Sequence, residues 1–291
     1  MSVSRSIIRP IIRSIIRGVS EGIGAVTTDF VFIMATTGAA ETVTIPCSNA
    51  GTFDAVIDWG DGSTSEITAY NDADLAHEYA DADDYTIRIS GTFPNIYFNN
   101  GGDKLKLKEV VNLGNVGWVD FYRSFSGCSN MTSFTVGNTD ISAATRLQDM
   151  FNGCSGLTLL SLTGFNTSLI TTMVGMFSGC AALVEIDVSG FDMTSVTTVN
   201  GMFYSCFVAD DIPMDAWIIE SITDMTSMMI NCALLTSRYD AILIAWDAQN
   251  PVDSLSPNFG ASKYTGGGAA AAARANLIST DLWTITDAGI A

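Results

Sequence analysis

A four-residue motif, Phe-x-Gly-Cys, recurs along the chain and constrains its fold more than any other feature. Three full copies occupy residues 125–128, 151–154 and 177–180, and two altered copies follow at 203–206 and 229–232. The cysteines of neighbouring copies are always 26 residues apart. A fixed period of this length is typical of a solenoid, in which each repeat forms one coil stacked on the previous coil.

The residues between the motifs indicate what each coil contains. After each cysteine, apolar residues such as Leu157, Leu160 and Leu162 end in an alternating pattern, which predicts one short strand per repeat. A segment rich in Thr and Ser then carries the chain back to the next motif. One repeat cannot bury its apolar residues alone, so we expect the coils to share one continuous core.

The repeated cysteines are interpreted as a structural ladder of buried thiols that pack as small apolar side chains. Disulfides or a metal site are less favoured, because no Cys-x-x-Cys pair exists and the single histidine, His77, lies far away in the sequence. We therefore predict no metal site and no cofactor here. The ladder consists of Cys128, Cys154, Cys180, Cys206 and Cys232.

The first residues of the chain have an unusual composition, in which pairs of Ile alternate with Arg. Wound as a helix, this pattern places the Ile residues on one face and the Arg residues on the other. Such a segment suits a membrane surface, an organellar transit peptide, or an assembly anchor that docks into a larger particle or self-associates. We favour the anchor and expect a homotrimer. The anchor residues are Ile7, Ile8, Ile11, Ile12, Ile15, Ile16, Arg9, Arg13 and Arg17.

Charge is distributed unevenly along the chain. The net charge is −18, from 13 Lys and Arg against 31 Asp and Glu. Residues 1–20 hold four Arg and no acidic residue, so the rest carries nine basic and 31 acidic residues, or −22. A body this acidic repels phosphates, which excludes nucleic acid as a partner. No run of 18 apolar residues is present, so no membrane span is expected, and the N-terminus lacks the apolar core of a signal peptide.

Residues 27–100 contain short alternating segments that predict several strands. Within them, Asp-Trp-Gly-Asp-Gly-Ser at 58–63, His77-x-Tyr79 and Tyr-Thr-Ile at 85–87 resemble the polycystic kidney disease (PKD) domain. The resemblance implies an immunoglobulin-like sandwich that serves as a spacer or binding module in surface proteins. It also favours a structural role for His77 over a catalytic one. Calcium binding by Asp58 and Asp61 is an alternative to an ordinary turn stabilised by these carboxylates.

The repeats carry a second resemblance. Residues 150–168 read Met-Phe-x-Gly-Cys-x-x-Leu-x-x-Leu-x-Leu-x-Gly-Phe-x-Thr-Ser, which resembles the BspA-like leucine-rich repeats of bacterial surface proteins. Such repeats also occur in predicted bacteriophage tail proteins. The later copies depart from the pattern, because Trp217 and Met229 replace phenylalanines. Beyond them, helical patterns at 239–246 and 269–277 and a strand pattern at 283–286 suggest a terminal cap.

The predicted fold class is mainly β, an immunoglobulin-like (PKD-like) β-sandwich followed by a leucine-rich-repeat solenoid with a small α/β C-terminal cap. The expected domains are the anchor at 1–26, the sandwich at 27–100, the solenoid with an irregular first coil at 101–235, and the cap at 236–291.

The resemblances imply a non-enzymatic, adhesive virion protein, such as a phage tail fibre or receptor-binding protein. Its expected partners are other virion proteins, bound through the N-terminus, and a host surface receptor or glycan. The alternatives are a capsid decoration or head fibre protein and a bacterial cell-surface adhesin. The expected location is the exposed surface of a phage particle, or otherwise the bacterial cell surface. No catalytic residue is predicted.

Overall fold

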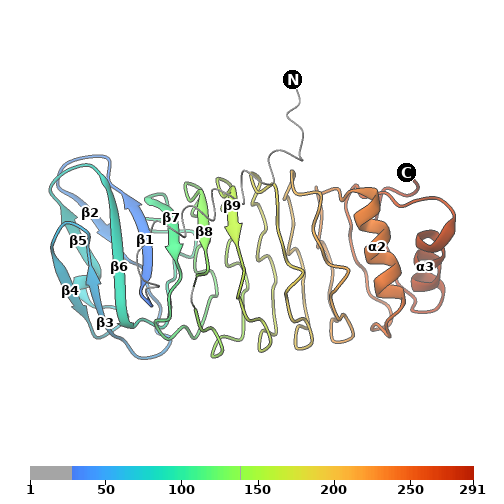
Figure 1. The fold of residues 1–291 in the computed structure, drawn as a ribbon, viewed down its shortest axis with the longest axis horizontal. Helices are drawn as coiled ribbons and strands as arrows, with labels where there is room; N and C mark the ends of the chain where they lie inside the picture. The colour runs from blue at the N-terminus through green and yellow to red at the C-terminus, as the bar shows by residue number, and fades with distance from the viewer. Residues whose placement is uncertain (1–27, 138) are drawn as a thin grey trace, which may run out of the picture.

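The computed structural model describes residues 28–137 and 139–291. In these residues the chain forms one elongated body, with strands at one end, a row of stacked coils in the middle and two helices at the other end (Figure 1). The predicted anchor at residues 1–26 lies outside the described residues.

Most of the regular strands lie in the first part of the body. Short segments with alternating exposed and buried residues form them, as in β3, where Ala55 and Ile57 point inward. A short 3-10 helix, η1 (Ala73–Leu75), precedes β5. The strands are β1 (Phe30–Ala35), β2 (Glu41–Thr44), β3 (Asp54–Asp58), β4 (Thr64–Ile67), β5 (Ala76–Tyr79), β6 (Asp84–Thr92), β7 (Leu107–Asn112), β8 (Ser133–Thr135) and β9 (Leu159–Ser161).

A single seven-stranded mixed sheet joins the first strands to the first repeats. Its order is β4-β3-β6-β1-β7-β8-β9, and β2 pairs with β5 in a separate two-stranded sheet. Strand β7 makes the connection, because it pairs antiparallel with β1 on one side and parallel with β8 on the other. Strands β1, β3, β4 and β6 therefore share one sheet with the first two repeats.

This sheet contradicts the predicted fold class, although its mainly-β character is confirmed. The prediction of an immunoglobulin-like sandwich followed by a leucine-rich-repeat solenoid is wrong, because the mixed sheet runs from β4 to β9 without a break between two such units. The predicted strand in every repeat is also wrong. Only β8 and β9 form within the copies, and the described residues after β9 contain two α-helices and no further regular strand. The predicted domain boundaries stay a prediction.

The missing strands have a local cause in the sequence. In the fourth copy, Pro213 lies where a ladder would need an amide donor, and proline has none. In the third copy, the Asp187 carboxylate accepts hydrogen bonds from the amide and the hydroxyl of Ser189, at 3.0 and 2.6 Å. This local turn competes with extended pairing.

The coils stack instead through their Thr-rich return segments. Isolated parallel bridges join Arg146 to Thr172, Thr172 to Thr198, and Thr198 to Asp224. Each of these steps is 26 residues long, which agrees with the sequence period. Inside the stack, the motif phenylalanines form a column, with ring centroids 5.7–5.8 Å apart from Phe125 to Phe203. We call residues 121–235 the repeat stack.

The glycine of the motif has a conformational role. Gly127, Gly153 and Gly179 have φ values of 80°, 75° and 75°, in the left-handed region that glycine adopts without strain. The altered copies place Ser205 (φ 59°) and Asn231 (φ 64°) at the same point. The turn therefore persists, at a cost in backbone strain for these two residues. The motif therefore encodes a sharp turn that directs the cysteine inward.

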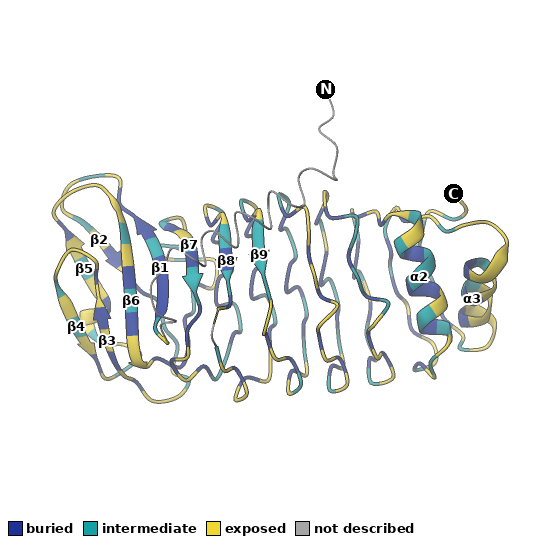
Figure 2. Ribbon diagram, in the orientation of Figure 1, coloured by how far each residue is buried: buried dark blue, intermediate teal, exposed yellow. Residues whose placement is uncertain are grey.

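Two helices cover the far end of the repeat stack (Figure 2). Helix α2 (Thr236–Asp247) buries Tyr239, Ile242, Leu243 and Trp246, while α3 (Gly268–Ser279) buries two alanines and Leu277. Stacking of Trp217 on Trp246 extends the aromatic column into α2. The strand predicted at 283–286 does not form, and only an isolated bridge at Thr286 does. One hydrophobic cluster runs through the body from Phe30 to Trp283.

Candidate functional site

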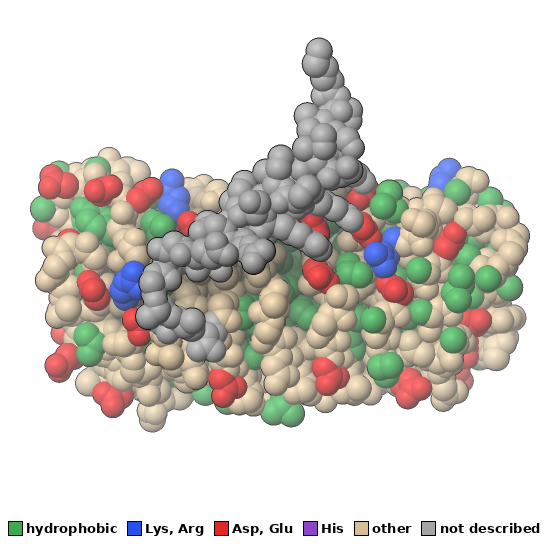
Figure 3. Space-filling model, viewed as in Figure 1, with side chains coloured by type: hydrophobic (Ala, Val, Ile, Leu, Met, Phe, Trp, Pro, Cys, Tyr) green, Lys and Arg blue, Asp and Glu red, His purple; other side chains and the backbone are tan. Residues whose placement is uncertain are grey.

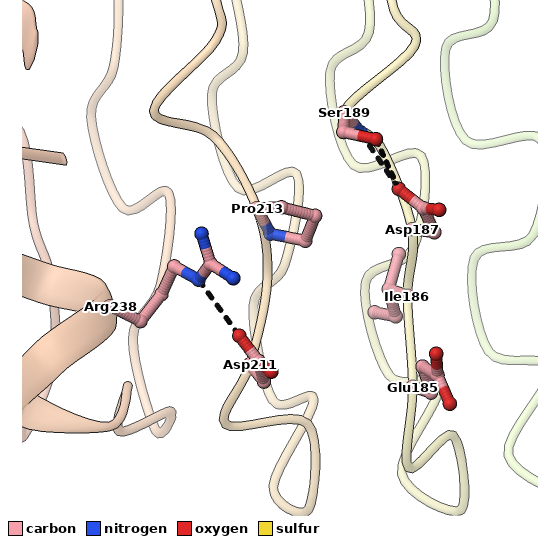
Figure 4. A pocket seen from close by; sticks show the side chains of 7 residues that line it. All are labelled: Glu185, Ile186, Asp187, Ser189, Asp211, Pro213 and Arg238. Carbon is pink, nitrogen blue, oxygen red and sulfur yellow. Dashed lines mark hydrogen bonds and ion pairs between the residues drawn. The ribbon is translucent and has the colours of Figure 1, made fainter. Parts of the chain in front are cut away.

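A shallow pocket opens on the repeat stack between the third and fourth copies. Its volume is about 240 Å³. Figure 4 shows Glu185 and Asp187 on one coil, Asp211 and Pro213 on the next, and Arg238 reaching over from α2. Ile186 and Ser189 complete the lining. The pocket thus combines three carboxylates, a hydroxyl and a guanidinium.

Arg238 is held in place by two of the acidic residues of the fourth copy. Its Nε lies 2.8 Å from an Asp211 oxygen, and its Nη1 lies 2.5 Å from an Asp215 oxygen. Burial alone would lower the pKa of Arg238, and the hydrogen bonds and charges of Asp211 and Asp215 raise it. The guanidinium is therefore positioned and permanently charged at the pocket edge.

The pocket lies where hydrogen bonding between coils is interrupted. On the return side, the amides of Thr171, Thr197 and Thr223 each bond to a carbonyl of the preceding coil, at 2.8–2.9 Å. Among the described residues, no backbone hydrogen bond joins residues 184–187 to either neighbouring coil. In the described part of the chain, backbone hydrogen bonds therefore do not join the coils beside the carboxylates.

The fourth copy also exposes large apolar side chains at positions that are small or polar in most other copies. Phe207 is 61% exposed, where the other copies have Ser129, Ser155, Ala181 and Ala233. Its neighbour Val208 is 45% exposed, and in the third copy Val184, beside Glu185, is 57% exposed. The packing of the repeat does not explain these residues, since the equivalent side chains elsewhere are small, polar or buried.

The predicted PKD-like motif residues come together at a different place, in the turn between β3 and β4 and on β5 and β6. His77 Nε2 lies 2.7 Å from an oxygen of Asp61 and 3.3 Å from Ser63 Oγ, and its ring stacks on Trp59. Both Asp61 and Ser63 contact the same ring nitrogen. In a catalytic triad, the acid and the nucleophile use opposite nitrogens of the imidazole. These contacts therefore hold the turn between β3 and β4 in place, and they do not pair a nucleophile with its base.

The two carboxylates considered for calcium are used by the same turn. Asp58 accepts a hydrogen bond from the Gly60 amide, and Asp61 accepts two from Ser63. Burial would raise the pKa of Asp61, but the hydrogen bonds from Ser63 and His77 lower it to about 2. Residues 28–137 and 139–291 contain no group of three potential metal-binding side chains. Calcium binding here stays a prediction.

The five cysteines of the ladder are all free and buried. From the second copy onward, each thiol donates to the carbonyl of the motif phenylalanine in the preceding coil, as Cys154 does to Phe125 at 3.1 Å and Cys180 to Phe151 at 3.2 Å. Burial raises the pKa of Cys180 to about 12, so its thiol is protonated and unreactive at neutral pH.

Sequence reasoning missed the pocket and the thiol-to-carbonyl contacts. The pocket had a visible signal, because Glu185 and Asp187 replace neutral residues at the equivalent positions of the two earlier copies, and Asp211 repeats the acidic position of Glu185. Figure 3 shows acidic side chains spread over this face, in keeping with the charge of the body. The anchor residues lie outside the described residues. In the described part of the chain, no helix is long and apolar enough to cross a membrane.

Comparison with known proteins gives one similarity. Residues 119–242 match a family model described as "Mycoplasma protein of unknown function, DUF285". The match covers the repeat stack and the first half of α2, and its description assigns no activity. No curated protein and no solved structure matches the chain.

Proposed function

We propose that this protein is a non-enzymatic attachment protein of a phage particle, a tail fibre or receptor-binding protein, in which the repeat stack contacts the host surface. One observation carries the proposal. The outside of the third and fourth copies departs from the repeat, because it presents exposed apolar side chains and the pocket that Arg238 lines. Surface variation on a constant scaffold is how repeat proteins create binding faces.

The composition of residues 1–20 supports the assembly part of the proposal. Four Arg and no acid precede a body of charge −22, so the two parts suit different surroundings. In the proposed function this segment joins copies to each other or to the particle. Several copies then bind weakly in parallel, and avidity supplies the overall strength.

The chemistry of the described residues is in keeping with a binding role. The thiols of the ladder are buried, and the single histidine is occupied by the Asp61 and Ser63 contacts. A bacterial surface adhesin is the second candidate, because the matched family model is described by a bacterial genus. A capsid decoration protein would use the same N-terminal segment to dock into a shell.

The proposal is tested by attachment to cells. Fluorescently labelled full-length chain is sedimented with a panel of Gram-negative and Gram-positive bacteria, beside a labelled acidic protein of similar size. We expect saturable cosedimentation with some strains that unlabelled chain competes away. If no strain retains the chain above the acidic control, the attachment function is wrong.

A further inference from the structure

We propose that the pocket between the third and fourth copies binds a neutral saccharide, an inference that rests on the proposed attachment function and names its ligand class. The site consists of Glu185, Asp187, Asp211 and Arg238, with the exposed apolar residues Val184 and Phe207 on the same two coils.

The polar groups of the site suit a polyhydroxylated ligand. A sugar hydroxyl both donates and accepts, so it needs acceptors and donors close together. Glu185 and Asp187 supply carboxylate acceptors, and Arg238 supplies charged donors whose position is fixed by its two aspartates.

The charge of the site argues against acidic sugars and phosphates. Glu185, Asp187, Asp211 and Asp215 outnumber the single guanidinium, and the surrounding body is strongly acidic. A sialic acid, a uronic acid or a phosphorylated glycan would be repelled by them. A neutral hexose or N-acetylhexosamine meets no such penalty.

The exposed apolar side chains suit the remaining part of a sugar. The faces of a pyranose ring carry C–H groups, which pack on aromatic and aliphatic surfaces. Phe207 precedes Asp211 by four residues in the same coil, and Val184 adjoins Glu185. Within the pocket itself, Pro213 and Ile186 line the wall and offer the apolar contact. An extended basic peptide has related requirements, so the experiment includes it as an outcome.

The test uses full-length protein on an array of neutral, sialylated and phosphorylated oligosaccharides, followed by titration of the best neutral binder. Glu185→Ala removes an acceptor whose side chain is exposed, so the fold should be unaffected. We expect about a tenfold loss of affinity, the usual effect of losing one hydrogen bond to a charged group. Glu220→Ala, at an exposed glutamate outside the pocket, is the matched control and should bind as the parent does.

Three results would overturn the inference. These are no binding to any neutral saccharide, equal affinity of the Glu185→Ala and Glu220→Ala variants, or tight binding of an oligo-arginine peptide in place of sugars. The cell sedimentation assay separates this inference from the proposed function. If the Glu185→Ala variant still attaches to cells like the parent, the pocket assignment fails while attachment stands. If the parent does not attach, the function itself fails.

Discussion

Replacing Phe177 with alanine should destabilise the repeat stack strongly, because this ring lies in the middle of the aromatic column. It is fully buried and stacks on Phe151 at 5.8 Å and on Phe203 at 5.7 Å, with interplanar angles of 6° and 9°. Truncation of a buried phenylalanine costs about 3–5 kcal/mol. Each stacked pair adds roughly 0.5–1.5 kcal/mol, so we expect a loss near the upper end, about 4–5 kcal/mol.

A matched control exists on the surface of the same stack. Phe207→Ala removes the same atoms from a side chain that is 61% exposed, so the free energy of unfolding should change by about 0.5 kcal/mol or less. Urea denaturation followed by circular dichroism and by tryptophan fluorescence measures both variants. Trp217 stacks 6.4 Å from Phe203, so fluorescence reports directly on the column. A loss below about 1 kcal/mol in Phe177→Ala, or equal losses in both variants, would refute the column as a source of stability.

Three further predictions concern the glycine of the turn, the loss of stability at low pH and the reactivity of the thiols. Gly179→Ala should lower the free energy of unfolding by about 1–2 kcal/mol, because alanine is strained at φ 75°. Ser205→Gly should raise it, because glycine adopts φ 59° without strain. Chemical denaturation in which Gly179→Ala is the more stable of the two variants would contradict this. The pKa of Asp61 is lowered from 3.8 in the unfolded chain to about 2 in the folded chain. Its contribution to the free energy of unfolding is therefore present above pH 3.8 and is lost as the pH falls through 2. In Asp61→Asn, the free energy of unfolding should therefore fall less between pH 4 and pH 2 than it does in the parent. An unchanged pH dependence would show that the contacts of Asp61 do not stabilise the turn. In a thiol titration of the native chain, no ladder thiol should react within minutes, and Cys47, whose pKa burial also raises, should react slowly. All six thiols should react in denaturant, and rapid reaction of a native ladder thiol would show that the ladder is accessible.

The sequence predicts local features of this fold better than long-range ones. The left-handed turn at Gly153 and the burial of Cys154 depend on neighbours in the chain, so the motif carries them directly. The pairing of β7 with both β1 and β8 depends on segments far apart, and each of these strands alone has the same alternating pattern in a sandwich or in a mixed sheet. The predicted separation between sandwich and repeats failed for this reason.

The candidate site escaped prediction for a related physical reason. A pocket between two coils depends on where the inter-coil hydrogen bonds stop and on which side chains then face each other. Pro213 is visible as a break in a strand, but the approach of Arg238 from α2 to Asp211 spans 27 residues and is fixed only by the position of the helix. The unusual residues could be noticed in the sequence, whereas their convergence could not.

In the proposed function, the N-terminal segment assembles several copies of the chain, and their repeat stacks then bind the host surface at the same time. Light scattering of the full chain, beside a full-length variant carrying Ile8→Asp, Ile12→Asp and Ile16→Asp, tests it directly. We predict a trimer, three times the 30.9 kDa chain mass, for the parent and a monomer for the variant. If both are monomers and only the parent binds anionic phospholipid vesicles, the segment is a membrane anchor and the assembly account is wrong.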